Sequence, residues 1–125
     1  MFINISNHPS SKWSEKQINE ALKYYGEIWD IPFPNINPHW TESQVDIIVN
    51  EYFQKVMELK KTKRKSESVY VHLMGESGFV VSLANCLENK FIDVLYSTTE
   101  RLVTENENGE KIVKFEFVKF RKYFL

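Results

Sequence analysis

The sequence predicts an α/β fold, with a mostly parallel sheet that carries helices on both faces and ends in an antiparallel hairpin. Apolar segments of strand length alternate with longer segments of helical periodicity, which is the order typical of a parallel sheet. The last part of the chain no longer alternates strands with helices. Two runs of strand-like residues there flank Asn108-Gly109, a strong hairpin signal. At 125 residues the chain can bury one core, so we expect residues 1–125 to form a single domain.

Two of the helices begin at clear capping signals. Ser14 and Gln17 have the spacing of a capping box, in which each side chain satisfies a backbone N–H of the first turn, and Trp13 stands at the staple position before them. The second helix repeats the device with Thr41 and Gln44. Both boxes are followed by apolar residues at helical spacing, so we expect a helix after each of them.

Four apolar segments have the length and composition of strands, at residues 2–5, 27–31, 69–74 and 92–96. Prolines exclude residues 32–38 from a sheet and predict a rigid loop after the second strand. The small residues at 75–78 predict a turn that opens a third helix. The hairpin is expected to join residues 102–105 to residues 111–120.

The expected topology gathers three polar stretches at one edge of the sheet. In a doubly wound sheet the first strand is central, and its neighbour across the change of direction is the third strand. The loops that begin at Ser6 and Gly75 then face each other across a crevice, and residues 97–101 form a further wall. The first loop offers hydroxyls, an amide, an imidazole and a lysine, which suit a phosphate. The candidate ligand-binding residues are Ser6, Asn7, Pro9, Gly75, Glu76, Ser77, Ser97, Thr98, Thr99 and Arg101.

Most of these signals also have a purely structural interpretation. Gly75 and Gly78 fit turn geometry and close packing as well as a close approach to a ligand. Glu76 and Ser77 are both residues that favour a helix N-terminus. The hydroxyls after the fourth strand are also common at strand ends. Only their coincidence at one edge favours a site.

The basic run at residues 60–65 has two interpretations. It fits a solvated connection whose cations complement a helix C-terminus, and it also fits a polyanion site. The run precedes the third strand, which places it at the edge opposite the ligand-binding loops. We therefore favour the solvated connection.

Composition and motifs exclude several classes of function. The formal net charge of −1 gives no overall field for duplex DNA or a membrane, and no apolar run approaches the roughly 20 residues of a membrane span. A single cysteine, Cys86, suits a reducing compartment, and the first residues do not resemble a signal peptide, so we expect a cytoplasmic protein.

Cofactor and metal motifs are also missing from the sequence. There is no G-x-G-x-x-G or Walker pattern, and the three histidines are scattered without metal spacing, so we expect no cofactor and no metal. His72 lies within an apolar strand, which favours a core histidine with satisfied hydrogen bonds. Trp13 is expected to serve mainly as a helix staple.

Four stretches together resemble a known family. They are SNHPSSKW at residues 6–13, DIPFP at 30–34, MGE at 74–76 and STTER at 97–101. In these the chain resembles small CRISPR-associated proteins of type III systems, which are similar to stand-alone CARF (CRISPR-associated Rossmann fold) domains. The resemblance covers essentially the whole chain and implies a CARF-like, Rossmann-like domain.

The resemblance implies a homodimer whose two crevices join into one site for a cyclic oligoadenylate second messenger. Several single-domain members are ring nucleases, which cleave this messenger and switch the antiviral response off, whereas others only sense it. No effector domain is visible in this sequence, and this favours a nuclease. Two-fold symmetry suits an even ring, so cyclic tetra-adenylate is the expected substrate. The alternatives are a sensor or sponge that only binds the messenger, and another small nucleotide-binding domain.

A metal-free ring nuclease uses the ribose 2′-hydroxyl of its ligand as the nucleophile. The protein must hold that hydroxyl in line with the next phosphate and stabilise charge on the phosphate oxygens. The candidate catalytic residues are His8, Ser10, Ser11 and Lys12. Histidine is well suited to move a proton near neutral pH, so His8 is the candidate for this step, although a hydrogen bond that orders its own loop is an equal alternative.

Overall fold

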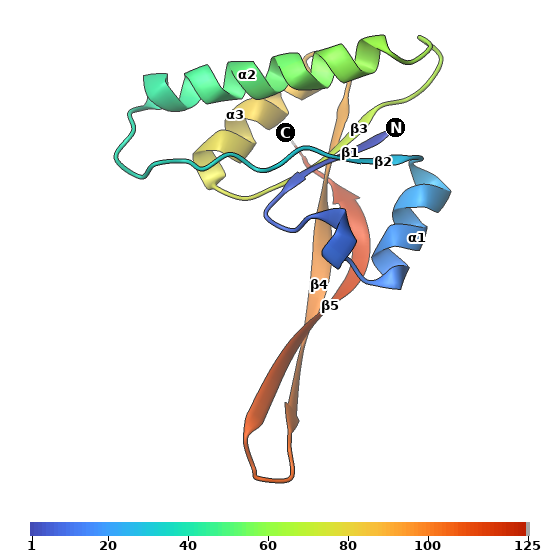
Figure 1. The fold of residues 1–125 in the computed structure, drawn as a ribbon, viewed down its shortest axis with the longest axis vertical. Coiled ribbons are helices and arrows are strands. Elements are labelled where there is room, and N and C mark those ends of the chain that lie inside the picture. Colours follow the sequence, from blue (N-terminus) through green and yellow to red (C-terminus); the bar gives the residue numbers. More distant parts are fainter. Residues whose placement is uncertain (125) are drawn as a thin grey trace.

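The computed structural model describes residues 1–124 and contains one five-stranded sheet in the order β2-β1-β3-β4-β5 (Figure 1). The first four strands run parallel to one another, and β5 is antiparallel to β4. The strands are β1 (Phe2–Ser6), β2 (Ile28–Asp30), β3 (Tyr70–Met74), β4 (Asp93–Glu105) and β5 (Lys111–Lys122). The predicted α/β class is confirmed, as is the position of the first strand beside the third.

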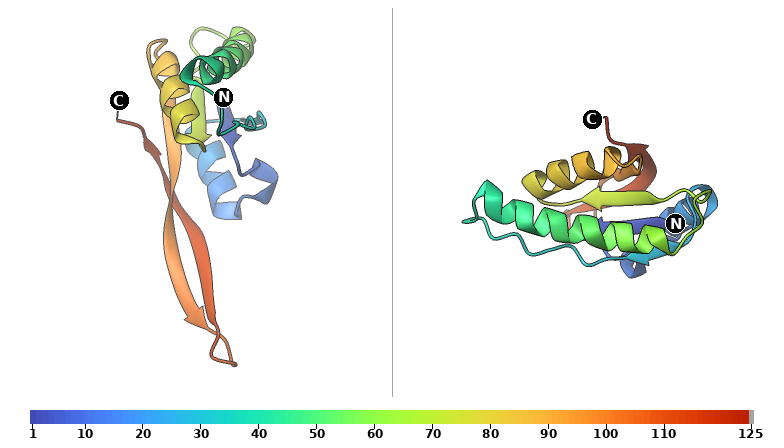
Figure 2. Two further views of the ribbon diagram at one scale, coloured as in Figure 1. Left: turned by 90° about the vertical axis from the view of Figure 1, so that its left-hand side faces the viewer. Right: turned by 90° about the horizontal axis from the view of Figure 1, so that it is seen from above.

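Helices cover both faces of the sheet, as the sequence predicted. They are α1 (Glu15–Tyr24), α2 (Glu42–Lys61) and α3 (Ser77–Glu88), with a short 3₁₀ helix η1 (Ser10–Lys12) before α1. α2 and α3 lie side by side over one face, and α1 lies on the other (Figures 1 and 2). Alternation along β1 separates the two cores, because Ile3 and Ile5 pack with the α2–α3 layer whereas Phe2 packs with residues near α1.

Helix caps explain where α1 and α2 begin. Thr41 and Gln44 form the complete capping box that the sequence predicted for α2. The box predicted for α1 is only half present. The Ser14 hydroxyl accepts the Gln17 backbone N–H at 3.2 Å, but the Gln17 side chain bonds to Ser97 instead of returning to Ser14. A tertiary contact has therefore replaced the local one.

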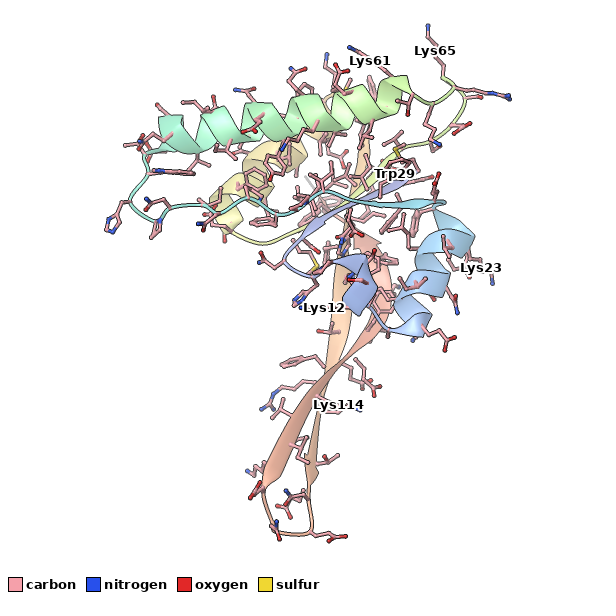
Figure 3. All side chains as sticks on the ribbon, in the orientation of Figure 1. Lys12, Lys23, Trp29, Lys61, Lys65 and Lys114 are labelled. Atoms are coloured by element: carbon pink, nitrogen blue, oxygen red, sulfur yellow. The ribbon has the colours of Figure 1, made fainter. Side chains whose placement is uncertain are left out.

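The basic run lies at the end of the sheet where the expected topology placed it. Lys60 and Lys61 end α2, and Lys63 lies 3.6 Å from the Glu27 carboxylate, in the connection that leads to the start of β3. Figure 3 shows Lys61 and Lys65 pointing outward there. This arrangement is that of a solvated connection with cations at a helix C-terminus.

β4 is much longer than predicted, and this is the main correction to the fold. Residues 97–101 were expected to form a polar loop, but they continue the strand and pair with β5. The hairpin prediction is confirmed, with its turn at residues 106–110 and Gly109 at φ +78°. The distal parts of β4 and β5 form an arm that projects from the body (Figures 1 and 2). Pairing with β5 satisfies the backbone N–H and C=O groups of residues 97–101, whose polar side chains had suggested a loop.

A β-bulge in β5 places two phenylalanines on one face. Thr98 pairs with Lys119 and Thr99 pairs with Phe117, which leaves Val118 without a partner in the ladder. Regular alternation would turn Phe117 and Phe120 to opposite faces, because they are three residues apart. With the extra residue between them both pack in the cluster around Phe2, where the rings of Phe120 and Phe2 lie 5.1 Å apart.

We expect Phe120→Ala to lower the free energy of unfolding by about 3–5 kcal/mol, because it removes a large ring from a closed aromatic cluster. Phe115→Ala on the same strand is the matched control, since Phe115 is 66% exposed and Phe120 is 6% exposed. Urea denaturation at low protein concentration measures both. Equal losses in the two variants would contradict this description of the core.

Candidate functional site

A cleft of about 600 Å³ lies where the arm leaves the body, on the face that carries α1. Five segments contribute to it: the loop after β1, the first turns of α1, the end of β3, and β4 and β5 at the base of the arm. Its lining residues are His8, Lys12, Trp13, Ser14, Gln17, His72, Met74, Ser97, Thr99, Phe115 and Phe117. None of these lining residues is acidic. Figure 3 shows Lys12 near the base of the arm.

The polar groups behind the cleft are organised by Asn4, whose side chain is almost fully buried on β1. Its amide nitrogen donates to the Asp30 carboxylate at 2.7 Å and to the His8 carbonyl at 3.0 Å. Its amide oxygen accepts from the Ser6 hydroxyl at 2.8 Å and lies 2.8 Å from His72 Nδ1. One side chain thus joins three strands and the first loop.

This network fixes the tautomer of His72. The Asn4 oxygen can only accept, so His72 Nδ1 carries the proton and donates it. Nε2 is then the acceptor, and it lies 2.6 Å from the Ser97 hydroxyl, which donates to it. His72 is 2% exposed and both of its nitrogens are bonded, so the prediction of a satisfied core histidine is confirmed.

Burial also keeps His72 neutral. Its ring lies among Phe2, Trp13 and Phe120, with centroid distances of 5.3 to 5.9 Å. Burial, with a smaller effect from the charge of His8, lowers the pKa of His72 from 6.5 to about 3. The neutral form, with its one proton on Nδ1, therefore prevails throughout the range around neutral pH.

The first loop is held by hydrogen bonds of its backbone and of the Ser10 hydroxyl. The His8 carbonyl accepts from the Asn4 amide and from Trp13 Nε1, each at 3.0 Å. Asp30 accepts from the Ser10 backbone N–H at 3.0 Å and also from the Ser10 hydroxyl. Burial of Asp30 acts to raise its pKa, but the hydrogen bonds from Ser10 and Asn4 outweigh it and hold the pKa below the usual value. The anchored loop presents His8 and Lys12 to the cleft.

The structure divides the predicted site residues into groups. Four of them line the cleft, namely His8, Lys12, Ser97 and Thr99. Three others, Ser6, Asn7 and Pro9, border a smaller hollow of about 280 Å³ between the first loop and the proline-rich loop. The remaining residues border neither space: Ser10, Ser11, Gly75, Glu76, Ser77, Thr98 and Arg101. Ser10 bonds to Asp30, and Thr98 donates to the Lys119 carbonyl at 3.2 Å, so both hydroxyls already have protein partners.

The loop after β3 does not face the cleft, contrary to expectation. A Cβ on Gly75 would lie 2.2 Å from the Phe33 ring, so the glycine makes room for a protein side chain. The Glu76 carboxylate accepts the backbone N–H groups of Gly78 at 3.0 Å and Phe79 at 2.9 Å. The start of α3 is therefore capped by its own carboxylate, and the helix-forming interpretation of Glu76 is the one that the structure supports.

Several residues in or behind the cleft were not among the predicted site residues. Asn4 was assigned to an apolar strand, Gln17 to a capping box, and Phe117 to one strand of the hairpin. A signal was available for Asn4, because an amide within an otherwise apolar strand needs buried partners. Gln17 and Phe117 gave no such signal, since their roles depend on the length of β4 and on the bulge.

Comparison with known proteins places the chain in a family. The model of the Uncharacterized protein MJ1673 family matches residues 1–121. The chain belongs to this family. It is similar to the Uncharacterized protein MJ1673 of Methanocaldococcus jannaschii, with 28% identity over 119 residues that cover 91% of this chain and 92% of the relative. No solved structure matches the chain.

Within residues 1–124, no helix has the length and apolar character needed to cross a membrane. The same residues contain no group of three or more His, Cys, Asp or Glu side chains placed to hold a metal ion.

Acid should destabilise the protein through His72. The unfolded chain binds this proton below about pH 6.5, whereas the folded chain binds it only near pH 3, so stability falls as the pH falls between these values. We expect a slope approaching ~1.4 kcal/mol per pH unit between pH 6 and 4.5.

Chemical denaturation across this pH range measures the slope. His72→Gln should flatten it even if that variant is less stable overall. His39→Gln is the matched control, since His39 is exposed, and it should leave the slope unchanged. An unaltered slope in His72→Gln would show that other groups cause the acid sensitivity.

Proposed function

We propose that this protein binds a cyclic oligoadenylate in the cleft and cleaves it without a metal, as a ring nuclease. The observation that carries the proposal is the composition of the cleft, which combines aromatic rings, two side chains that bear or acquire positive charge, hydroxyls and no carboxylate. Aromatic rings stack on nucleobases, and cations bind phosphates. The resemblance of four sequence stretches to type III CRISPR-associated proteins supports the same ligand class.

The parts of a nucleotide match different parts of the cleft. Trp13, Phe115 and Phe117 offer ring surfaces near its deeper polar groups, and these suit a base. Lys12 and His8 are exposed and come from the first loop, where they suit a phosphate. Ser14 also borders the cleft at the N-cap of α1, which places the positive end of the helix dipole near the same phosphate.

In the proposed reaction the ribose 2′-oxygen attacks the adjacent phosphorus, and the bond from phosphorus to the 5′-oxygen breaks. The 2′-proton goes to a base, the 5′-oxygen takes up a proton, and the product carries a 2′,3′-cyclic phosphate. Both His8 and Lys12 line the cleft, and in this proposal His8 transfers the protons and Lys12 stabilises charge on the phosphate oxygens. Ser10 serves the loop through Asp30, so it is a positioning residue in this proposal.

We include a homodimer in the proposal, because two-fold symmetry suits a cyclic tetra-adenylate. Exposed apolar side chains on the arm are available for such a contact: Val103, Ile112, Val113 and Phe115. Phe115 also lines the cleft and is 66% exposed, so a second copy on the arm would close the open side of the site. An isolated two-stranded ribbon gains stability from such packing.

Incubation of the pure protein with cyclic tetra-adenylate in EDTA tests the reaction. We expect linear products that end in a 2′,3′-cyclic phosphate. Lys12→Ala and His8→Ala should each lower the rate by about 100-fold or more, with little change in melting temperature, because both side chains are exposed. Lys16→Ala is the control, since Lys16 is exposed but does not line the cleft.

Intact rings after hours with stoichiometric protein would refute the nuclease. Tight binding without turnover would instead favour the sensor or sponge. An absence of thermal stabilisation by cyclic tetra- or hexa-adenylate would argue against the ligand class itself, because a ligand of the folded state must raise its apparent stability.

A further inference from the structure

The side chains behind the cleft form a chain of hydrogen bonds in which each group donates to the next. The chain runs from Gln17 through Ser97, His72 and Asn4 to Asp30. The Asn4 amide nitrogen lies between two groups that only accept, the ionised Asp30 carboxylate and the His8 carbonyl. The Asn4 side chain therefore cannot flip without placing its oxygen against both acceptors. Its fixed oxygen in turn fixes the proton of His72 on Nδ1.

The donor and acceptor roles are also fixed for the two side chains that reach the cleft, Ser97 and Gln17. His72 Nε2 can only accept, so the Ser97 hydroxyl uses its proton there, at 2.6 Å. The Ser97 oxygen then accepts from Gln17 Nε2 at 3.1 Å. This contact sets the orientation of the Gln17 amide, whose nitrogen and not its oxygen must face Ser97.

One acceptor and one donor remain at adjacent positions. The Ser97 oxygen has two lone pairs, of which Gln17 uses one. The Gln17 nitrogen has two hydrogens, of which Ser97 uses one. Within residues 1–124 neither remaining group has a further protein partner, and both side chains line the cleft.

We propose that Ser97 and Gln17 form a base-reading pair that selects adenine over bases with an oxygen at the six-position of the purine ring. This deepens the proposed function and rests on it for the class of ligand, a nucleotide. Adenine presents an amino donor beside a ring nitrogen acceptor, which complements the free acceptor of Ser97 and the free donor of Gln17. In the same orientation, hypoxanthine and guanine present an oxygen where adenine has the amino group, so two acceptors would meet at Ser97.

The pair distinguishes adenine from the other purines because the Ser97 hydroxyl cannot exchange its role of acceptor for that of donor. An ordinary serine hydroxyl rotates and either donates or accepts, and it would tolerate both kinds of base. Ser97 can donate to a ligand only by abandoning His72 Nε2, which would leave a buried acceptor without a partner. A site whose buried polar groups are left unpaired by the wrong ligand discriminates strongly against it.

Aromatic rings around the pair suit the faces of a base. Trp13 lines the cleft with its indole anchored by the bond from Nε1 to the His8 carbonyl, and Phe117 lines it from β5. Reading the edge of a base by hydrogen bonds while aromatic rings hold its faces is a general mode of base recognition.

Binding of adenosine 5′-monophosphate and inosine 5′-monophosphate, measured by calorimetry, tests the proposal because the two differ only at the edge of the base. We expect the inosine compound to bind at least about tenfold more weakly to the wild type. Ser97→Ala should reduce this ratio toward one, and Gln17→Met should weaken the adenosine compound more than the inosine compound. Ser82→Ala is the matched control, since Ser82 is exposed on α3 and borders neither space, and it should keep the ratio.

Equal binding of both nucleotides by the wild type, or no binding of either at millimolar concentration, would overturn the proposal. So would an unchanged ratio in a folded Ser97→Ala variant, with folding checked by its melting temperature. The result is separable from the nuclease. A preference for adenine with no cleavage of cyclic tetra-adenylate refutes the reaction alone, and cleavage without a preference refutes the base-reading pair alone.

Discussion

The amide of Asn4 is the contact on which the rest of this structure depends. It is 1% exposed, and its two ends bond to Asp30 on β2, His72 on β3 and the carbonyl of His8 in the first loop. A buried amide without these partners would cost several kcal/mol, so each partner is held in place by the need to satisfy it. The position of the loop, the tautomer of His72 and the orientation of Ser97 all follow from that requirement.

The two faces of the sheet have separate roles as a consequence. The face under α2 and α3 is an apolar core that includes Ile3, Ile5, Val71 and Leu73. On the other face the polar side chains of Asn4 and His72 alternate with these residues and lead to the cleft. The second face still contains a compact aromatic cluster around Phe2, which excludes water from the polar chain and strengthens its hydrogen bonds. The apolar core under α2 and α3 and the polar side chains behind the cleft thus lie on opposite faces of the same strands.

Much of the fold followed from local patterns. The strand positions, the caps at Ser14 and Thr41, the proline-rich loop and the hairpin at Asn108-Gly109 are all set by neighbours within a few residues, so the sequence alone predicts them. The candidate site was predicted only in part. His8 and Lys12 reach the cleft, but the loop at Gly75 is closed by Phe33, a residue more than forty positions earlier in the chain.

The sequence by itself determined the α/β class, the first strand and the loop that follows it, because periodicity and capping are local properties of the chain. Only the tertiary structure decided the length of β4, the bulge at Val118 and the partners of Asn4, Gln17 and Ser97. Each of these depends on which distant group lies opposite in the sheet. A polar residue needs a hydrogen-bond partner in either case, and the local pattern cannot tell whether that partner is water, its own helix or a strand eighty residues away.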